Sequence, residues 1–264
     1  MEIELLADEH VKEINEGLSL IQKKNGLTFG TDAYLLSAYV AASPRALCVD
    51  LGSGTGIIAL LLCQRGKVGR AVGVEVQPDF AALIGRNATL NGLDGRLSAL
   101  CADVRGVSQV SLGAHLGEEQ GKAADIVVCN PPYMKVTSGR RNEHDEKFIA
   151  RHEVCGDIGD FCAAAARVLR FGGRFYIVYR PDRLTDLTVA MRASGLEPKK
   201  MTFVHADEAS EPSMVLVEAR LGGASGLVVT SPLILHETSS KGARCRPMTV
   251  AAQRIYDTMS FTEM

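Results

Sequence analysis

The stretch Arg45-Ala-Leu-Cys-Val-Asp-Leu-Gly-Ser-Gly-Thr-Gly56 is followed without a break by Ile57-Ile-Ala-Leu-Leu-Leu62. The apolar run before the first glycine predicts a buried strand, and the apolar run after the last glycine predicts a buried helix. Glycines between them let the backbone turn tightly and approach a ligand with no side chain in the way. Strand, glycine turn and helix in this order are typical of a nucleotide-binding α/β unit. The G-x-G-x-G spacing differs from that of dinucleotide enzymes, so the turn alone is a weak indication.

Two further strands of the predicted sheet end close to an acidic residue. Residues 71–75 end in Glu75, about 20 residues after the glycine turn, where an acid can accept hydrogens from both ribose hydroxyls. Residues 97–102 lead into Asp103, which could accept a hydrogen from an adenine amino group. Either acid could instead cap the element that follows it, and the sequence leaves this alternative open.

A fourth strand, residues 124–129, runs into Asn130-Pro-Pro-Tyr133. Proline fixes its own φ and moves the preceding residue out of the helical region, so this turn is stiff. It would hold the Asn130 amide oxygen and the Pro131 carbonyl as a pair of acceptors for a planar NH2 group, with Tyr133 as a stacking surface. The alternative is an ordinary proline-stiffened turn after a strand.

All four features follow strands, and ligands of open parallel sheets lie outside the carboxyl ends of the strands. The sequence therefore predicts an α/β fold of the Rossmann-like kind in which these features face one crevice. Agreement among four separate elements is stronger than any one of them.

On these residues the chain resembles class I S-adenosylmethionine-dependent methyltransferases, in the amino-methylating branch with an Asn-Pro-Pro-Tyr motif. Within that branch it resembles bacterial tRNA1(Val) (adenine-N6)-methyltransferases, which modify the adenosine 3′ of the anticodon. The resemblance covers roughly residues 16–240. It is carried by Leu27-Thr-Phe-Gly-Thr-Asp32, Asn130-Pro-Pro-Tyr133, Ala150-Arg-His-Glu153, Val168-Leu-Arg-Phe-Gly-Gly-Arg-Phe175 and Pro232-Leu-Ile-Leu235.

The resemblance implies a seven-stranded, mostly parallel sheet with an antiparallel last strand and helices on both faces. It also implies S-adenosylmethionine as cofactor, N6-methylation of an adenine in RNA as activity, tRNA as partner and no metal. The cofactor residues would be Phe29, Thr31, Asp50, Gly52, Gly54, Gly56, Glu75, Asp103, Val104 and Asn130. The catalytic group would be Asn130, Pro131, Pro132 and Tyr133. The substrate would also contact the basic residues Lys23, Lys24, Arg140 and Arg141.

Composition sets the limits of the interpretation. The chain has 264 residues, 46% hydrophobic and 23% charged, which suits one globular domain over 1–264. No apolar run approaches the ~18 residues of a membrane span, and the acidic start lacks a signal-peptide pattern, so we expect a cytoplasmic protein. Its net charge of −2 is the main argument against an RNA substrate. The chain has seven cysteines, and no two of them are spaced as C-x-x-C. We expect them to be small buried residues that form no disulfide and bind no zinc.

Four segments outside the motifs carry expectations of their own. Residues 1–26 are expected to be an N-terminal arm with short strands, and Thr31 or Asp32 is expected to cap a helix over 32–41. Polar residues 134–156 form a loop too long for an ordinary connection and are expected to be a mobile substrate loop. The basic tail 240–264 is expected to be loosely ordered. A helix over 157–170, ended by Gly172-Gly173, would precede the fifth strand.

The sequence leaves four other functions open. A glutamine methyltransferase acting on release factors uses the same motif, but such enzymes usually carry a helical N-terminal domain, for which we expect no room before residue 52. A DNA adenine methyltransferase would normally need a recognition domain. Guanine-N2 methylation of ribosomal RNA is harder to exclude. A non-catalytic cofactor-binding module is disfavoured because it would not need Glu75, Asn130 and Tyr133 together.

Overall fold

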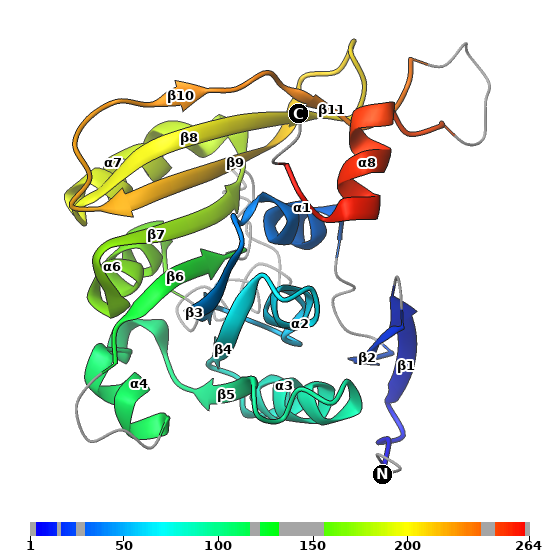
Figure 1. Ribbon diagram of the computed structural model, residues 1–264, viewed down its shortest axis with the longest axis vertical. Coiled ribbons are helices and arrows are strands. Elements are labelled where there is room, and N and C mark those ends of the chain that lie inside the picture. Colours follow the sequence, from blue (N-terminus) through cyan, green and yellow to red (C-terminus); the bar gives the residue numbers. More distant parts are fainter. Residues whose placement is uncertain are drawn as a thin grey trace, which may run out of the picture.

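A computed structural model describes residues 4–14, 17–24, 30–116, 122–131, 156–238 and 246–261. Its centre is a nine-stranded sheet with the order β10-β8-β9-β7-β6-β3-β4-β5, in which β11 also pairs with β8 (Figure 1). The strands of this sheet are β3 (Ser43–Leu51), β4 (Val68–Glu75), β5 (Leu97–Cys101), β6 (Ala124–Cys129), β7 (Leu169–Tyr179), β8 (Leu196–His205), β9 (Pro212–Leu221), β10 (Val228–Val229) and β11 (Leu233–Ile234).

The expected count of seven strands is wrong, because β10 and β11 are additional. Each is only two residues long and pairs in parallel with the edge of β8. So short a segment carries no periodic pattern that a sequence could reveal. The expected directions are confirmed, since β9 is antiparallel to both β7 and β8 while the other pairs in the sheet are parallel.

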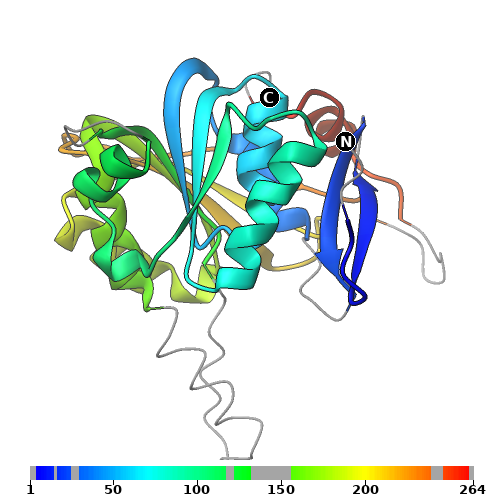
Figure 2. The same cartoon turned by 90° about the horizontal axis from the view of Figure 1, so that it is seen from below.

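Helices cover both faces of the sheet and enclose two apolar cores. On one face lie α1 (Thr31–Tyr39), α2 (Ile57–Gln64), α3 (Pro78–Leu90) and α8 (Val250–Thr258). On the other lie the short helix η1 (Val104–Gly106), α4 (Gln109–His115), α6 (Ile158–Val168) and α7 (Leu184–Ala193), which follows η2 (Pro181–Arg183). Figure 2 shows the two helical layers on either side of the twisted sheet. Every residue of α2 except the last is buried, as its unbroken apolar run predicts.

The N-terminal arm contains an antiparallel hairpin of β1 (Glu9–Ile14) and β2 (Leu18–Lys23), which lies beside α3 (Figure 2). Two asparagines hold it, Asn87 within α3 and Asn91 at the C-terminal cap of that helix. Asn87 accepts a hydrogen bond from the Ile21 amide at 2.7 Å, and Asn91 accepts one from the Ser19 amide at 2.9 Å. The hairpin is thereby attached to the same helix that follows Glu75.

The expectation of a loosely ordered C-terminal tail is wrong for residues 246–261. Helix α8 packs beside α1, where Tyr256 stacks on Tyr34 with ring centroids 4.7 Å apart (Figure 1). The Lys67 ammonium donates three hydrogen bonds of 2.8 Å, to the carbonyls of Ser37, Ala38 and Met259. The basic residues of the tail suggested an exposed segment, so the apolar face by which α8 packs was not recognised from the sequence.

Three local expectations are also corrected. Helix α1 begins one residue earlier than expected, with Gly30 at its cap position and no capping side chain there. Strand β7 begins at Leu169, directly after α6, so that Gly172-Gly173 lies inside the strand at an irregularity in its pairing with β6. Cys101 is exposed, whereas the other four cysteines in the described part of the chain are buried, and all five are free.

Within the described ranges, no helix is long and apolar enough to cross a membrane. The expected mobile loop 134–156 lies outside the described residues, apart from Gly156.

Candidate active site at the carboxyl edge of the sheet

The four features expected to share one crevice leave the sheet at the same level. Leu51, the last residue of β3, pairs with Val74 on one side and with Cys129 on the other. Glu75 in turn pairs with Cys101. The glycine turn, Glu75, Asp103 and Asn130 therefore all follow strand ends at one edge. Because the chain proceeds from β3 to β4 on one side and returns to β6 on the other, this is also the switch point at which open sheets bind ligands.

The glycine turn requires a positive φ at three of its positions. Gly52, Gly54 and Gly56 have φ of 71°, 57° and 86°, values that cost a residue with a Cβ atom about 1–2 kcal/mol or more. A Cβ atom at Gly54 would meet no atom within 4 Å, so this glycine borders open space. A Cβ at Gly56 would come within 3.2 Å of Ile84, so that glycine is needed for packing. The turn thus presents bare backbone at Gly54.

Asp50 is a buried carboxylic acid beneath this turn, and the residue is 1% exposed. One oxygen accepts a hydrogen bond of 2.6 Å from the Ser53 hydroxyl, while Oδ1 has no hydrogen-bond partner in the described part of the chain. Burial raises the pKa of Asp50 to about 7, and the negative charge of Glu75 adds to the rise. A buried acceptor with one unused oxygen suits a cationic ligand.

Glu75 connects the end of β4 to the glycine turn. Its Oε2 accepts a hydrogen bond of 3.0 Å from the Gly54 amide, and its Oε1 accepts one of 2.9 Å from the Gln77 amide. The residue is buried, at 6% exposure. Both oxygens are therefore held in place, and each retains a lone pair for a hydroxyl donor.

Asp103 caps the helix that follows it, which is the alternative to a role in binding adenine. It is the cap residue of η1 and accepts a hydrogen bond of 2.8 Å from the Arg105 amide. Arg105 also forms an ion pair with it at 2.5 Å, and these hydrogen bonds hold the pKa of Asp103 below its ordinary value. Val104 follows within η1 and is buried.

Asn130 lies directly beyond β6 and contacts the start of α1. Its Nδ2 donates a hydrogen bond of 3.0 Å to Oδ2 of Asp32. Its Oδ1 is buried and has no partner among the residues that the structure describes. Pro131 follows and is buried. Within the described residues, the amide oxygen is therefore an acceptor without a donor, held in a fixed direction.

The other expected site residues divide into two groups. Thr31 begins α1, next to Asp32, and is exposed. Lys23 forms an ion pair of 2.9 Å with Asp79, and Lys24 donates a hydrogen bond of 2.8 Å to the Ala7 carbonyl. Lys23 and Asp79 lie where β2 meets the start of α3, which follows Glu75. The remaining expected site residues fall outside the described part of the chain, namely Phe29, Pro132, Tyr133, Arg140 and Arg141.

Three residues that support the site escaped sequence reasoning. Ser53 holds Asp50, and Asp32 holds Asn130. Asn87 is fully buried and donates to the Thr55 carbonyl at 3.0 Å while it also bonds β2, so it joins the hairpin to the glycine turn. A signal existed only for Asn87, because this asparagine falls among the apolar residues Leu83, Ile84 and Ala88 on the buried face of α3.

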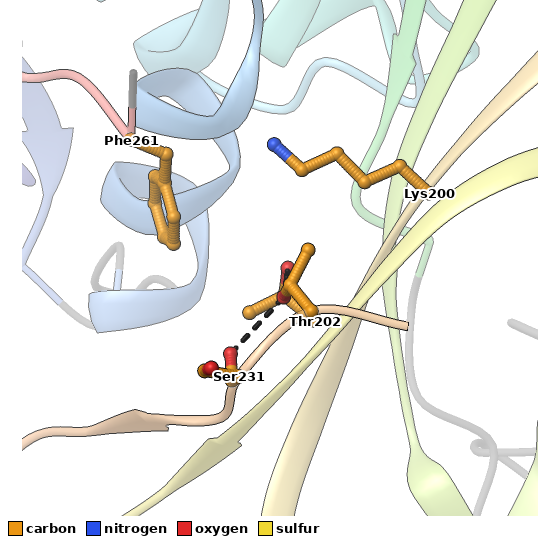
Figure 3. Close-up of a pocket in the computed structure, with 5 residues that line it drawn as sticks. Lys200, Thr202, Ser231 and Phe261 are labelled. Atoms are coloured by element: carbon orange, nitrogen blue, oxygen red, sulfur yellow. Dashed lines mark hydrogen bonds between the residues drawn. The ribbon is translucent and has the colours of Figure 1, made fainter. Parts of the chain in front are cut away.

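A cavity of about 140 Å³ lies elsewhere, between β8, the link from β10 to β11, and the C-terminal segment (Figure 3). It is lined by Lys200, Thr202, Thr230, Ser231 and Phe261. Lys200 stands 4.9 Å above the ring of Tyr39, and the Thr202 and Thr230 hydroxyls bond each other at 2.7 Å. None of the expected site residues lines this cavity.

The sheet order, the glycine turn and the acidic strand end are those of a class I methyltransferase. A family model described as the methyltransferase small domain matches residues 24–192. The chain belongs to this family. The described residues contain no cluster of three side chains suited to a metal ion.

Two curated relatives carry the same name, tRNA1(Val) (adenine(37)-N6)-methyltransferase. The one from Porphyromonas gingivalis is 31% identical over 195 residues, which cover 72% of this chain and 73% of the relative. The one from Shewanella pealeana is 28% identical over 199 residues and covers 74% of each chain.

Solved structures share the fold. A predicted O-methyltransferase from Agrobacterium tumefaciens has a TM-score of 0.66 at 23% identity and covers 87% of this chain and 97% of its own. TYW2 from M. jannaschii, solved in complex with AdoMet, has a TM-score of 0.53 at 14% identity and covers 83% of this chain and 88% of its own.

The residues at the sheet edge fit S-adenosylmethionine, the methyl donor of these enzymes. The ligand combines positive charge with a ribose diol. Asp50 offers a buried oxygen that has no hydrogen-bond partner among the described residues, Glu75 offers a fixed carboxylate, and Gly54 leaves room for close approach. These acceptors match the chemistry of a cationic nucleoside, and they lie where open sheets of this kind bind ligands.

Proposed function

We propose that this protein methylates N6 of the adenosine 3′ of the anticodon in tRNA1(Val), at position 37, the site that the names of its curated relatives specify. The observation that carries the proposal is the Asn130 amide oxygen. It is a buried acceptor without a partner in the described ranges, and it lies at the switch point beside the glycine turn. An exocyclic amine is the group that such an acceptor would bind.

The cofactor would be held by the residues that surround the glycine turn. In this proposal Asp50 faces the positively charged end of the ligand, and Glu75 accepts from the ribose hydroxyls. Asp103, Val104, Phe29 and Thr31 are proposed to border the same ligand. When bound, S-adenosylmethionine supplies a methyl group on a sulfonium, which is already an activated leaving group.

The chain's own residues must align the acceptor nitrogen and favour its attack. Orientation alone supplies on the order of 7–11 kcal/mol of a barrier in well-aligned cases. Adenine N6 is a poor nucleophile because its lone pair is conjugated with the ring. Hydrogen bonds from N6 to Asn130 Oδ1 and to the Pro131 carbonyl let the nitrogen pyramidalise. They strengthen as positive charge develops on the nitrogen, which stabilises the transition state. The proton can leave afterwards to water, so no strong base is required.

The target base must leave its stack to reach these acceptors. Flipping costs a few kcal/mol and costs least in a single-stranded loop. Stacking on Tyr133 would return about 1–3 kcal/mol. An anticodon loop meets this requirement, because unpaired loops are where the bases of RNA are accessible. Arg140, Arg141, Lys23 and Lys24 are proposed to contact the phosphates, and a tRNA substrate implies a cytoplasmic enzyme.

The test is methyl transfer from labelled S-adenosylmethionine to total tRNA, to ribosomal RNA and to release factor, followed by nucleoside and amino-acid analysis. We expect N6-methyladenosine in tRNA, mapped to the residue 3′ of the valine anticodon. Label in a glutamine side chain, or in guanine of ribosomal RNA, would replace this function with one of the alternatives. Transcripts that differ only in that adenosine, with guanosine in its place, provide the matched control.

A further inference from the structure

Asp32 binds the NH2 group of the Asn130 side-chain amide. The two residues are distant in sequence, and their side chains meet where the start of α1 approaches the end of β6. Asp32 is itself restrained, because its Oδ1 accepts a hydrogen bond of 2.9 Å from the Ala33 amide. Its Oδ2 accepts the 3.0 Å bond from Asn130 Nδ2. The carboxylate thus joins the helix start to the proline corner.

This contact determines which way the amide points. A carboxylate has only acceptors, so the NH2 group of Asn130 must face Asp32 and the oxygen must face away. The oxygen that faces away is the buried acceptor without a partner in the described part of the chain. An asparagine without such a neighbour could turn its NH2 group to that position, and a donor there would repel a target amine. The negative charge also polarises the amide and strengthens its oxygen as an acceptor.

Gly30 supplies an independent sign that the position of Asp32 is constrained. Its φ is −104°, which any residue can adopt, so the backbone does not require a glycine. A Cβ atom at this position would lie 2.6 Å from Asp32 Oδ1. Any side chain at residue 30 would therefore displace the carboxylate.

We propose that Asp32 is a positioning residue for methyl transfer, which acts by orienting the Asn130 amide so that its oxygen receives the target amine. This inference rests on the proposed function. Asp32 itself touches neither the substrate nor the cofactor in this scheme.

The kinetic test compares wild type, Asp32→Asn and Asp32→Ala under single-turnover conditions with saturating S-adenosylmethionine. We expect Asp32→Ala to lower the rate about tenfold or more, as loss of a preorganised polar group does, and Asp32→Asn to fall between it and wild type. S-adenosylhomocysteine affinity should stay at the wild-type value. Asp186→Ala, which removes a first-turn carboxylate from α7, is the matched control and should retain the wild-type rate. A wild-type rate in Asp32→Ala would overturn the inference.

A double-mutant comparison separates positioning from general stability. If Asp32 acts through Asn130, then Asp32→Ala should cause no further loss in an Asn130→Ala background. A full additional loss in that background would show that Asp32 acts by another route and would overturn the inference.

A spectroscopic readout does not depend on the identity of the substrate. In 15N-labelled protein, the Asn130 side-chain amide is assigned by its disappearance in Asn130→Ala. We expect its protons to exchange slowly with solvent in wild type and much faster in Asp32→Ala, while those of Asn87 remain unchanged. Identical exchange in both proteins would refute the contact. If wild type transfers no methyl group to tRNA, the proposed function fails, and the kinetic comparison is run with the acceptor that labelling identifies.

Discussion

The Gly54 amide donates a hydrogen bond of 3.0 Å to the carboxylate of Glu75. This bond ties the residue that leaves open space in the glycine turn to the acidic end of the neighbouring strand. Because the second oxygen of Glu75 is held by the Gln77 amide, the carboxylate cannot rotate away from the edge of the sheet. One side chain thus shapes the turn and presents acceptors to a ligand.

Glu75→Ala should therefore weaken cofactor binding through both effects. We expect the dissociation constant of S-adenosylhomocysteine, measured by calorimetry, to rise at least about tenfold, or roughly 1.4 kcal/mol. Glu197→Ala removes a carboxylate from a surface ion pair with Arg192 and serves as the control. An unchanged constant in Glu75→Ala would mean that the ribose is held elsewhere.

Asn130→Ala should separate chemistry from cofactor binding. The substitution removes the buried acceptor, which has no partner in the described ranges, but leaves Gly54, Glu75 and Asp50 in place. We expect turnover to fall by about 10²–10³-fold, as for loss of one transition-state hydrogen bond, while the affinity for S-adenosylhomocysteine stays at the wild-type value. A comparable loss of cofactor affinity would show that Asn130 does not serve the target amine alone.

Binding of a cationic ligand near Asp50 should depend on pH. Burial raises the pKa of Asp50 to about 7 in the ligand-free protein, so the acid is protonated below that pH. A cation that needs the carboxylate must then displace a proton, and affinity should rise with pH by at most about tenfold per unit until the pKa is passed. Calorimetry between pH 5.5 and 8 should show this rise in wild type and a flatter profile in Asp50→Asn. Parallel profiles would refute the role of Asp50.

The same raised pKa should also affect the stability of the ligand-free protein. The folded-state value lies above the ~3.9 of an unfolded aspartate, so the protonated acid stabilises the fold fully below about pH 4. That contribution is lost as pH rises through about 7. Urea unfolding of wild type and Asp50→Asn should therefore show wild type losing stability relative to the variant from pH 5 to pH 8.

Lys67→Met should release the C-terminal helix. The Lys67 side chain is buried, and although burial lowers its pKa to about 7, its three carbonyl acceptors match the three donors of an ammonium. Without it, the Met259 carbonyl and the last turn of α1 lose a charged donor, which is worth about 1.5–3 kcal/mol per bond before the desolvation of the lysine is subtracted. We expect a lower urea midpoint and faster proteolysis near α8. Lys199→Met is the control, because this half-buried lysine donates a hydrogen bond to the Ala224 carbonyl rather than to α1 or the C-terminal segment.

The main elements of the fold were predictable because their patterns are local. An apolar run, a glycine turn and a second apolar run specify β3 and α2, and the registers of β4, β5 and β6 bring Glu75, Asp103 and Asn130 to one edge, as expected. The strands β10 and β11 were missed because two residues carry no period. Helix α8 was missed because it is held by residues far from it in sequence: Tyr34 stacks on Tyr256, and Lys67 bonds the carbonyl of Met259, which caps the helix.

The chemical character of the site follows from the types of residue that compose it. Glycine tolerates positive φ and proline restricts its neighbours in any fold. The order of the glycine turn, the acid at a strand end and the diproline corner along the chain is therefore enough to indicate a cofactor turn and an amine-binding corner. The direction of the Asn130 oxygen does not follow from the sequence, because the C=O and NH2 groups of an amide are nearly the same in size and shape. Only the packing of the α1 start against the β6 end brings the Asp32 carboxylate within 3.0 Å of one of them.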